Sequence, residues 1–214
     1  MLGDVLLLEE THRKAASQIL EVALAKMKVT NHKYVIAVSG ESGTGKSEIA
    51  HCLSELFKQQ GLKAKILHSD NCYKTTPHER QAWRQAHGVK SIGYTEYNWD
   101  KIEENIEDFR QGREAKMPCV DRLTDQDDIL LTHFENIDIL ILEGLYAIKA
   151  NTVDLRIFIE ITYQETKKAQ LKRGKEVMNE WREKELAREQ EVVQSLKELA
   201  NYLITRDFKL VAAK

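Results

Sequence analysis

The chain has 214 residues, of which 42% are hydrophobic and 31% are charged, and its formal net charge is −2 at pH 7. This length and composition are typical of one globular domain with a substantial buried core. The nearly balanced charge argues against a nucleic-acid-binding protein, which needs a strong positive field.

The cysteines and the hydropathy of the chain indicate the cellular compartment in which the protein is expected. Cys52, Cys72 and Cys119 are odd in number and widely spaced, so they predict free thiols in a reducing compartment rather than disulfides or a zinc site. The apolar run at residues 6–8 is far too short for a signal sequence or a membrane span. We therefore expect a cytoplasmic protein that binds neither a membrane nor nucleic acid.

An amphipathic helix is expected ahead of the first strand. Apolar residues recur at helical spacing and predict a helix over about residues 10–28. Packing against a sheet is the favoured role for this helix. A dimer contact is the alternative, so an oligomer stays possible.

Residues 40–47 read G-E-S-G-T-G-K-S and match the phosphate-binding loop G-x-x-x-x-G-K-[ST]. An apolar, β-branched segment at residues 34–39 predicts a strand before the loop, and an apolar stripe ending at Gly61 predicts a helix after it. Glycines let backbone N–H groups surround an anion, and the start of the helix adds its positive dipole end. The sequence therefore predicts a nucleoside triphosphate site formed by Gly40, Ser42, Gly43, Thr44, Gly45, Lys46, Ser47 and Glu48.

Within this loop two side chains have expected roles. Lys46 is expected to reach the β- and γ-phosphates, and the Ser47 hydroxyl is expected to complete the ligand shell of Mg²⁺. ATP and Mg²⁺ are accordingly the predicted cofactors.

Two further strands are predicted to end in acidic residues. A strand at residues 63–68 precedes Asp70, and ligands of open α/β sheets sit beyond the carboxyl ends of the strands. Asp70 is thus placed to meet a substrate, although an Asp at this point can also cap the next element. An apolar strand at residues 137–142 ends at Glu143, a pattern typical of a carboxylate that faces Mg²⁺.

The connection over residues 74–98 is long, polar and rich in aromatic residues. It predicts an acceptor pocket or a moving cover, and the alternative is a surface helix over about residues 77–86. A helix is then predicted from Trp99 to near Gly112, followed by a short strand or extended turn at residues 117–122. Residues 155–160 predict another strand, and residues 202–204 and 208–211 could close the sheet.

A highly charged helix is predicted over about residues 164–199, broken near Gly174. Its basic residues read mostly as a solvated face. Phosphoryl transfer nevertheless needs positive charge over the migrating phosphate, which lids commonly supply. The basic segment comprises Lys167, Lys168, Lys172, Arg173 and Lys175.

The glycine loop is followed in order by S-D-N-C-Y at residues 69–73, N-W-D at residues 98–100, a strand ending in E-G at residues 143–144, and the basic helix. From about residue 34 to residue 204, this order resembles the uridine kinase and phosphoribulokinase family of P-loop kinases. The resemblance implies an α/β, three-layer P-loop NTPase fold with a mostly parallel, doubly wound sheet and a helical lid. It also implies a single kinase domain over residues 1–214, with an acceptor-site insertion at about 73–125 and a lid at about 163–190.

The resemblance also implies roles for single residues. Asp70 matches the acidic residue that accepts the proton of the acceptor hydroxyl and helps to hold Mg²⁺, and Glu143 matches the acid near the metal. Tyr73 matches an aromatic residue beside the acceptor, and Arg173 matches a lid arginine that contacts the phosphates. We therefore expect Asp70, Lys46 and Arg173 to be catalytic.

This chain departs from uridine kinases on the acceptor side. Residues 93–97 read G-Y-T-E-Y where H-P-x-A is usual, and residues 118–123 contain no histidine. Phosphate handling is thus expected to be kept and pyrimidine recognition to be altered. Tyr73, Tyr97 and Arg122 are the predicted substrate contacts. Arg80, Arg84 and Arg122 could meet an anionic acceptor such as a sugar phosphate, or they could be solvated.

The sequence thus predicts an ATP-dependent kinase that transfers the γ-phosphate to a hydroxyl of a small molecule, with a nucleoside as the leading acceptor. A sugar phosphate, pantothenate or another small alcohol is the alternative acceptor. The alternative of another class is a nucleotide-dependent switch. The N/T-K-x-D tetrapeptide that recognises guanine is missing after the loop, which disfavours a GTPase-like switch.

Overall fold

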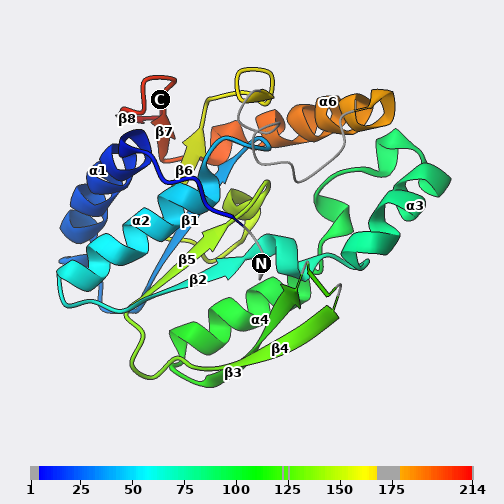
Figure 1. The fold of residues 1–214 in the computed structure, drawn as a ribbon. Coiled ribbons are helices and arrows are strands. Elements are labelled where there is room, and N and C mark those ends of the chain that lie inside the picture. Colours follow the sequence, from blue (N-terminus) through cyan, green and yellow to red (C-terminus); the bar gives the residue numbers. More distant parts are fainter. Residues whose placement is uncertain (1–4, 122, 125, 168–178, 214) are drawn as a thin grey trace.

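A six-stranded sheet forms the centre of the molecule in the computed structural model, which describes residues 5–121, 123–124, 126–167 and 179–213 (Figure 1). Across the sheet, the strands follow the order β2 (Ala64–His68), β5 (Ile139–Glu143), β1 (Tyr34–Gly40), β6 (Leu155–Ile159), β7 (Tyr202–Ile204) and β8 (Leu210–Ala212). All neighbouring pairs are parallel except β7 with β8. The predicted mostly parallel sheet is confirmed, including its two short C-terminal strands.

The sheet is covered by helices on both faces. The α-helices are α1 (Glu10–Met27), α2 (Lys46–Gln59), α3 (Pro77–His87), α4 (Trp99–Arg110) and α6 (Glu180–Ser195). The connections contain the short 3-10 helices η1 (Ser69–Cys72), η2 (Val89–Ser91), η3 (Tyr94–Glu96), η4 (Ala147–Lys149) and η5 (Lys197–Leu199). The helix that was the alternative for residues 77–86 is therefore present.

Alternate residues of β1 belong to two separate cores, because the sheet is buried on both sides. Val35 and Ala37 lie in a cluster with residues of α4 and α6. Ile36 and Val38 lie in a second cluster with residues of α1 and α2. The N-terminal helix α1 therefore packs against the same face of the sheet as α2. The predicted three-layer α/β architecture is confirmed.

An antiparallel hairpin lies apart from the main sheet. Strands β3 (Glu114–Asp121) and β4 (Gln126–His133) pair along their full length and lie beside α4 (Figure 1). The sequence predicted at most a short strand here and did not predict β4. The reason is that the apolar run of β4, residues 129–131, is only three residues long, and the polar residues around it show no clear alternation. All of β4 except Thr132 is exposed.

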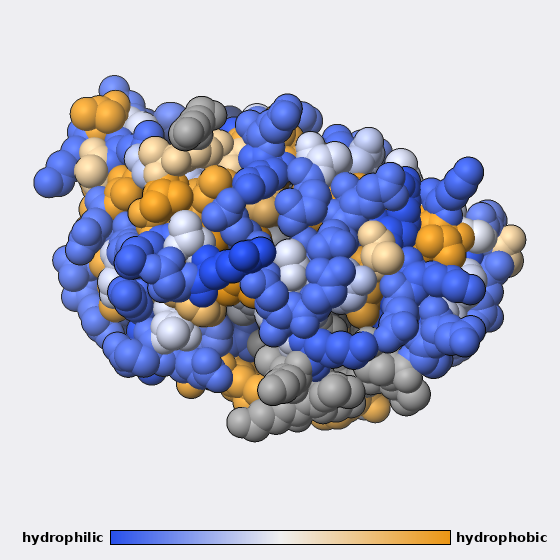
Figure 2. Space-filling view, turned by 90° about the horizontal axis from the view of Figure 1, so that it is seen from above, coloured by the Kyte–Doolittle hydropathy of each residue, from blue (hydrophilic) through white to orange (hydrophobic). Residues whose placement is uncertain are grey.

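The surface seen from above is mostly hydrophilic, with apolar side chains in small separate groups (Figure 2). Within the part of the chain that the structure describes, no helix is long and apolar enough to cross a membrane.

Candidate active site

The phosphate-binding loop joins the carboxyl end of β1 to the start of α2. Gly43 and Gly45 have positive φ angles of 78° and 89°, which side-chain-bearing residues rarely adopt. At Gly40 a Cβ atom would lie 2.9 Å from the Cβ of Ile159, so only glycine allows β6 to approach the loop this closely. Sequence and backbone therefore agree on a loop whose N–H groups can turn toward an anion.

Lys46 and Ser47 open α2 and have identifiable partners. The Lys46 ammonium donates to the backbone carbonyl oxygen of Glu41 at 2.8 Å, so its charge is held against the loop itself. The Ser47 hydroxyl donates to Glu143 Oε2 at 3.2 Å. The structure therefore brings together the phosphate loop and the acidic end of β5, 96 residues later in the sequence.

Glu143 is buried and bonded at both carboxylate oxygens. Its Oε1 lies 2.6 Å from His68 Nδ1, at the end of the neighbouring strand β2. Burial by itself would raise the pKa of Glu143, but the hydrogen bond and charge of His68, together with Lys46, outweigh burial and hold the pKa below its usual value. Glu143 is therefore held as an anion, the form that binds a cation. No sequence pattern pointed to His68.

Asp70 lies on η1, immediately after β2. Gly144, which follows Glu143, approaches it so closely that a Cβ there would lie 3.8 Å from Asp70 Oδ1 and only 1.8 Å from Ser69 Oγ. The Ser69 hydroxyl is buried, and no described residue forms a hydrogen bond with it. The E-G and S-D motifs therefore meet at the carboxyl edge of the sheet, where ligands of open α/β folds bind.

Two tyrosines whose rings are in contact orient Asp70. The Tyr97 hydroxyl lies 3.1 Å from Asp70 Oδ1 and 2.7 Å from the Tyr73 hydroxyl. Because Tyr97 has one O–H proton, its donation to Asp70 leaves Tyr73 to donate to Tyr97. Burial raises the pKa of both phenols well above the usual value, so both stay protonated donors. No described residue hydrogen-bonds to Asp70 Oδ2, which leaves that oxygen for another group.

The oxygen donors of Ser47, Glu143 and Asp70 suit Mg²⁺, which prefers a few protein oxygens completed by water and phosphate. The orphaned, buried Ser69 hydroxyl beside Asp70 is a further polar atom that a hydrated ion could satisfy. Among the described residues, no group of three or more His, Cys, Asp or Glu side chains could hold a metal ion alone. The arrangement therefore fits an ion that arrives with a nucleotide and not a closed protein metal site.

Glu41, the variable second residue of the loop, ties the loop to α6. Its side chain is 1% exposed and accepts hydrogen bonds from the Tyr163 N–H at 2.8 Å, Gln190 Nε2 at 3.1 Å and Gln194 Nε2 at 2.5 Å. The Thr166 hydroxyl donates to the backbone of Ser42 at 3.2 Å. Sequence reasoning missed this role, although the i, i+4 spacing of the two glutamines was visible.

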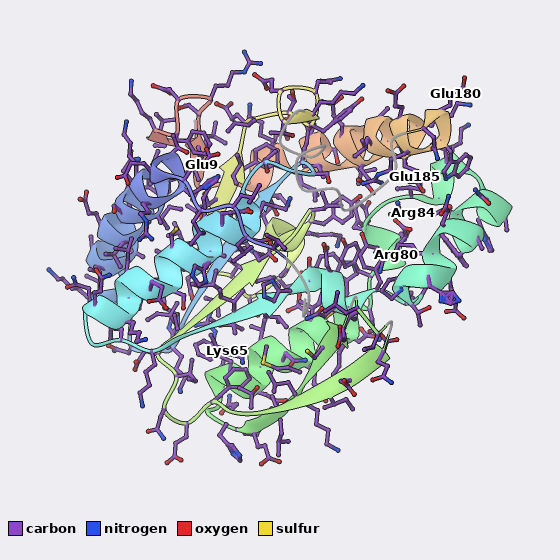
Figure 3. The ribbon with its side chains drawn as sticks, viewed as in Figure 1. Glu9, Lys65, Arg80, Arg84, Glu180 and Glu185 are labelled. Carbon is purple, nitrogen blue, oxygen red and sulfur yellow. The ribbon has the colours of Figure 1, made fainter. Side chains whose placement is uncertain are left out.

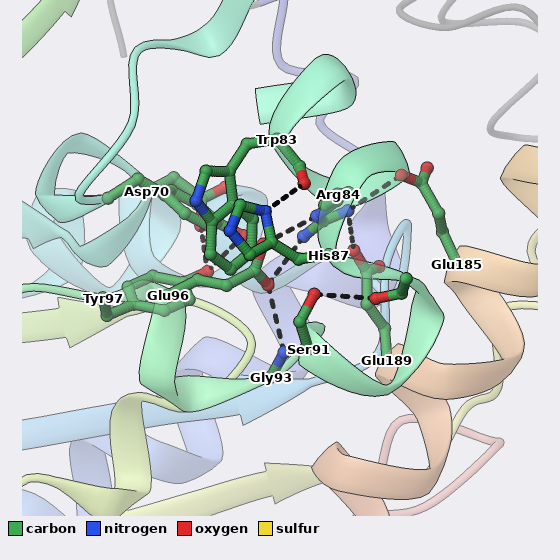
Figure 4. A network of polar contacts seen from close by, with 12 residues as sticks. Asp70, Trp83, Arg84, His87, Ser91, Gly93, Glu96, Tyr97, Glu185 and Glu189 are labelled. Carbon is green, nitrogen blue, oxygen red and sulfur yellow. Dashed lines mark hydrogen bonds and ion pairs between the residues drawn. The ribbon is translucent and has the colours of Figure 1, made fainter. Parts of the chain in front are cut away.

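Arg84 forms a buried ionic network between α3 and α6 (Figures 3 and 4). It contacts both oxygens of Glu96, at 2.7 and 3.0 Å, and approaches Glu189 at 3.0 Å and Glu185 at 3.5 Å. Burial alone would lower the pKa of Arg84, but Glu189 and Glu96 hold it above its usual value. Arg84 was expected either to be solvated or to bind an anionic acceptor. Both expectations are wrong, because Arg84 is buried and its guanidinium is paired with these glutamates.

The other predicted site residues differ in what the structure says of them. Arg122 and Arg173 lie outside the described residues. Glu48 is fully buried in the first turn of α2 and accepts the Leu7 N–H at 3.3 Å. Tyr97 has no exposed surface, so it can act only through Asp70 and Tyr73. Residues 163–167 and helix α6 are the described parts of the predicted lid region. Tyr163 contacts Glu41 of the loop, and Glu189 of α6 contacts Arg84.

A glycine loop on a parallel sheet, facing an acidic strand end and a second carboxylate, defines the class of P-loop phosphotransferases. The comparisons make this specific. Residues 35–179 match the model of the Phosphoribulokinase / Uridine kinase family, and the chain belongs to that family. The family resemblance seen in the sequence is confirmed.

Curated relatives and solved structures agree with this membership. The chain is 26% identical over 135 residues to the uridine kinase of Staphylococcus haemolyticus, covering 59% of this chain and 61% of the relative. It is 26% identical over 157 residues to a bifunctional alpha-galactosidase/sucrose kinase of Mediterraneibacter gnavus, covering 68% of this chain and 17% of the relative. The chain thus spans less than two thirds of these relatives.

The solved structures establish the fold. A putative fructose transport system kinase from Silicibacter superposes with a TM-score of 0.63 at 15% identity, covering 84% of this chain and 94% of that one. The D-glycerate 3-kinase from Cryptococcus neoformans superposes with a TM-score of 0.63 at 12% identity, covering 96% and 99%. The family and these neighbours are kinases of small molecules.

Proposed function

We propose that this chain is an ATP-dependent kinase that transfers the γ-phosphoryl group to a hydroxyl of a small molecule. The observation that carries the proposal is the convergence of the phosphate loop, Glu143 and Asp70 at one edge of the sheet, with Asp70 held by Tyr97 at 3.1 Å. A carboxylate with one fixed oxygen and one open oxygen is suited to orient an acceptor hydroxyl and take its proton.

In the proposed reaction, Asp70 accepts the hydroxyl proton while the acceptor oxygen bonds to the γ-phosphorus. The bond from that phosphorus to the β–γ bridging oxygen breaks, and ADP leaves. Lys46 and the loop N–H groups hold the β- and γ-phosphates. Ser47, Glu143 and Asp70 would hold Mg²⁺, which neutralises phosphate charge when bound. Catalysis is then mainly positioning and electrostatic stabilisation.

The acceptor and the surroundings are part of the proposal. A nucleoside is the first candidate, supported by the uridine kinases among the relatives, and a sugar phosphate, pantothenate or another small alcohol is the alternative. In this proposal residues 73–125 form the acceptor side, residues 163–190 the lid, and Arg122, Tyr73 and Arg173 contact the substrates. The free thiols fit a cytoplasmic enzyme.

A screen of ADP release with nucleosides, sugar phosphates, pantothenate and simple alcohols tests this function. Asp70→Asn should lower kcat by about 10²–10⁴-fold because the proton-accepting carboxylate is removed. ATP binding should be unchanged, because Lys46, the loop N–H groups, Ser47 and Glu143 remain. Lys46→Ala should weaken ATP binding. Unchanged turnover in Asp70→Asn would refute the role of Asp70. Preference for GTP without stimulation by any acceptor would favour the nucleotide-dependent switch instead.

A further inference from the structure

Two arginines on the same face of α3 are in opposite electrostatic situations. Arg84 is fully paired with glutamates. Arg80 lies one turn earlier and also projects from α3 toward the centre of the molecule (Figure 3). Among the described residues, no carboxylate lies within ion-pair distance of Arg80, and none accepts a hydrogen bond from its buried Nε. A half-buried guanidinium without a counterion is unfavourable, so this position is suited to receive an anion.

The position of Arg80 connects it to the proposed catalytic base. Its guanidinium carbon lies 3.3 Å from the centre of the Tyr73 ring. From Tyr73 the hydrogen-bonded chain continues to Tyr97 at 2.7 Å and on to Asp70 at 3.1 Å. An anion bound by Arg80 would therefore be bound at the acceptor side of Asp70.

Both faces of Tyr73 are covered. The Tyr97 ring lies 4.1 Å from the Tyr73 ring, centre to centre, and Arg80 lies directly over Tyr73 at 3.3 Å. These two groups cannot share one face, so they enclose the ring between them. A nucleobase could stack on Tyr73 only by displacing Arg80. A stacked guanidinium, by contrast, keeps its in-plane N–H groups free for a carboxylate or phosphate.

We propose that Arg80 binds an anionic group of the acceptor, so that the preferred substrate is an alcohol bearing a carboxylate or a phosphate instead of a neutral nucleoside. This inference rests on the proposed kinase function, and among its candidate acceptors it favours the anionic alcohols over the nucleoside. Arg80 fixes the anion, and this fixes the distance of the hydroxyl from Asp70. Tyr73 holds the guanidinium plane in place by cation–π contact.

Matched acceptors test the charge requirement. Glycerate against glycerol gives the carboxylate pair, ribulose 5-phosphate against ribulose gives the phosphate pair, and uridine is the neutral nucleoside. We expect one acid to exceed its neutral partner in kcat/KM by about 100-fold, because a charge-assisted bidentate contact is lost in the neutral partner. The pair that shows this difference identifies the anion. Equal turnover within both pairs, or preference for uridine, would overturn the proposal.

Variants test whether Arg80 is the group responsible. Arg80→Gln should lower kcat/KM for the acid by about 10- to 100-fold, with little change for the neutral partner or in KM for ATP. Arg80→Lys should recover part of the loss, because the charge remains and the planar fork does not. Arg13→Gln, at an exposed position on α1, is the matched control and should change nothing. An equal loss for acid and neutral acceptors would show that Arg80 only supports Tyr73.

Binding without turnover separates this proposal from the kinase function. The thermal midpoint of the wild-type chain should rise with glycerate or ribulose 5-phosphate and not with their neutral partners, and Arg80→Gln should abolish the rise. This result would support the anion site even if no acceptor stimulates ADP release. No shift with either acid, in a chain whose midpoint rises with ATP, would overturn the anion site and leave the nucleotide site intact.

Discussion

The Arg84 network permits a stability prediction that can be worked from the structure. Arg84→Met removes the charge but keeps much of the side-chain volume. Arg84 is 4% exposed, and its removal leaves Glu96, Glu185 and Glu189 facing one another with Arg182 as the remaining cation, at 3.2 and 3.5 Å from two of them. The loss is therefore uncompensated carboxylate charge in a buried position and not merely a missing contact.

Breaking a buried ion pair on one side costs about 3–5 kcal/mol. Since several carboxylates remain, we expect about 4 kcal/mol here, which for a chain of this length lowers the thermal midpoint by about 8–16 °C. Urea unfolding at neutral pH, followed by fluorescence and circular dichroism, measures this change. Replacing Glu189 by Gln in the Arg84→Met background should restore part of the stability, because one unpaired charge is removed.

Arg113→Met is the matched control for this measurement. Arg113 pairs with Asp108 at 2.9 Å, but its side chain is 54% exposed, and such a surface pair contributes only about 0–1 kcal/mol. If Arg84→Met costs no more than Arg113→Met, then the buried network does not hold α3 and α6 together, and the reasoning is refuted.

Three further changes have expected outcomes. Gly144→Ala should lower kcat at least about 10²-fold because its Cβ would lie 1.8 Å from Ser69 Oγ. Gly61→Ala, whose Cβ meets nothing within 4 Å but whose φ of 76° strains an alanine, should lower stability and keep turnover. Glu41→Ala should raise KM for ATP about 10-fold, because the Gln190 and Gln194 amides lose the carboxylate that accepts their hydrogen bonds. An unchanged KM would show that the contact between the loop and α6 does not affect nucleotide binding. Burial raises the pKa of Tyr34 from 10.0 to about 12. The contribution of protonated Tyr34 to the stability of the fold is therefore complete below pH 10 and is lost as the pH rises toward 12. Between pH 10 and 12, the midpoint of urea unfolding should therefore fall less in Tyr34→Phe than in the wild-type chain. Equal falls in the two proteins would contradict this role of Tyr34.

Local sequence was sufficient for the nucleotide half of the molecule. The glycine loop, the apolar strands and the helix stripe each specify a local conformation, and their carboxyl-end positions follow from the rules of parallel sheets. Lys46, Ser47 and Glu143 could be placed for this reason. Asp70 followed from its position after a predicted strand, strengthened by the family resemblance.

The part of the molecule around α3 and the β3–β4 hairpin depended on contacts between residues far apart in the chain. Whether Arg84 is solvated or buried is decided by glutamates 12 and 105 residues away, and no local pattern encodes that pairing. Likewise, the exposed strand β4 gains its structure by pairing with β3 and not from its own hydropathy.

The sequence by itself therefore determined the fold class, the nucleotide loop and the strand ends around it, because these depend on backbone geometry and periodicity. Only the tertiary structure decided which charges are neutralised and which are not. Arg80 and Arg84 lie one turn apart in similar sequence surroundings, yet one is enclosed by carboxylates and the other lies over Tyr73. Electrostatic pairing depends on distance in space, and that distance exists only once the chain has folded.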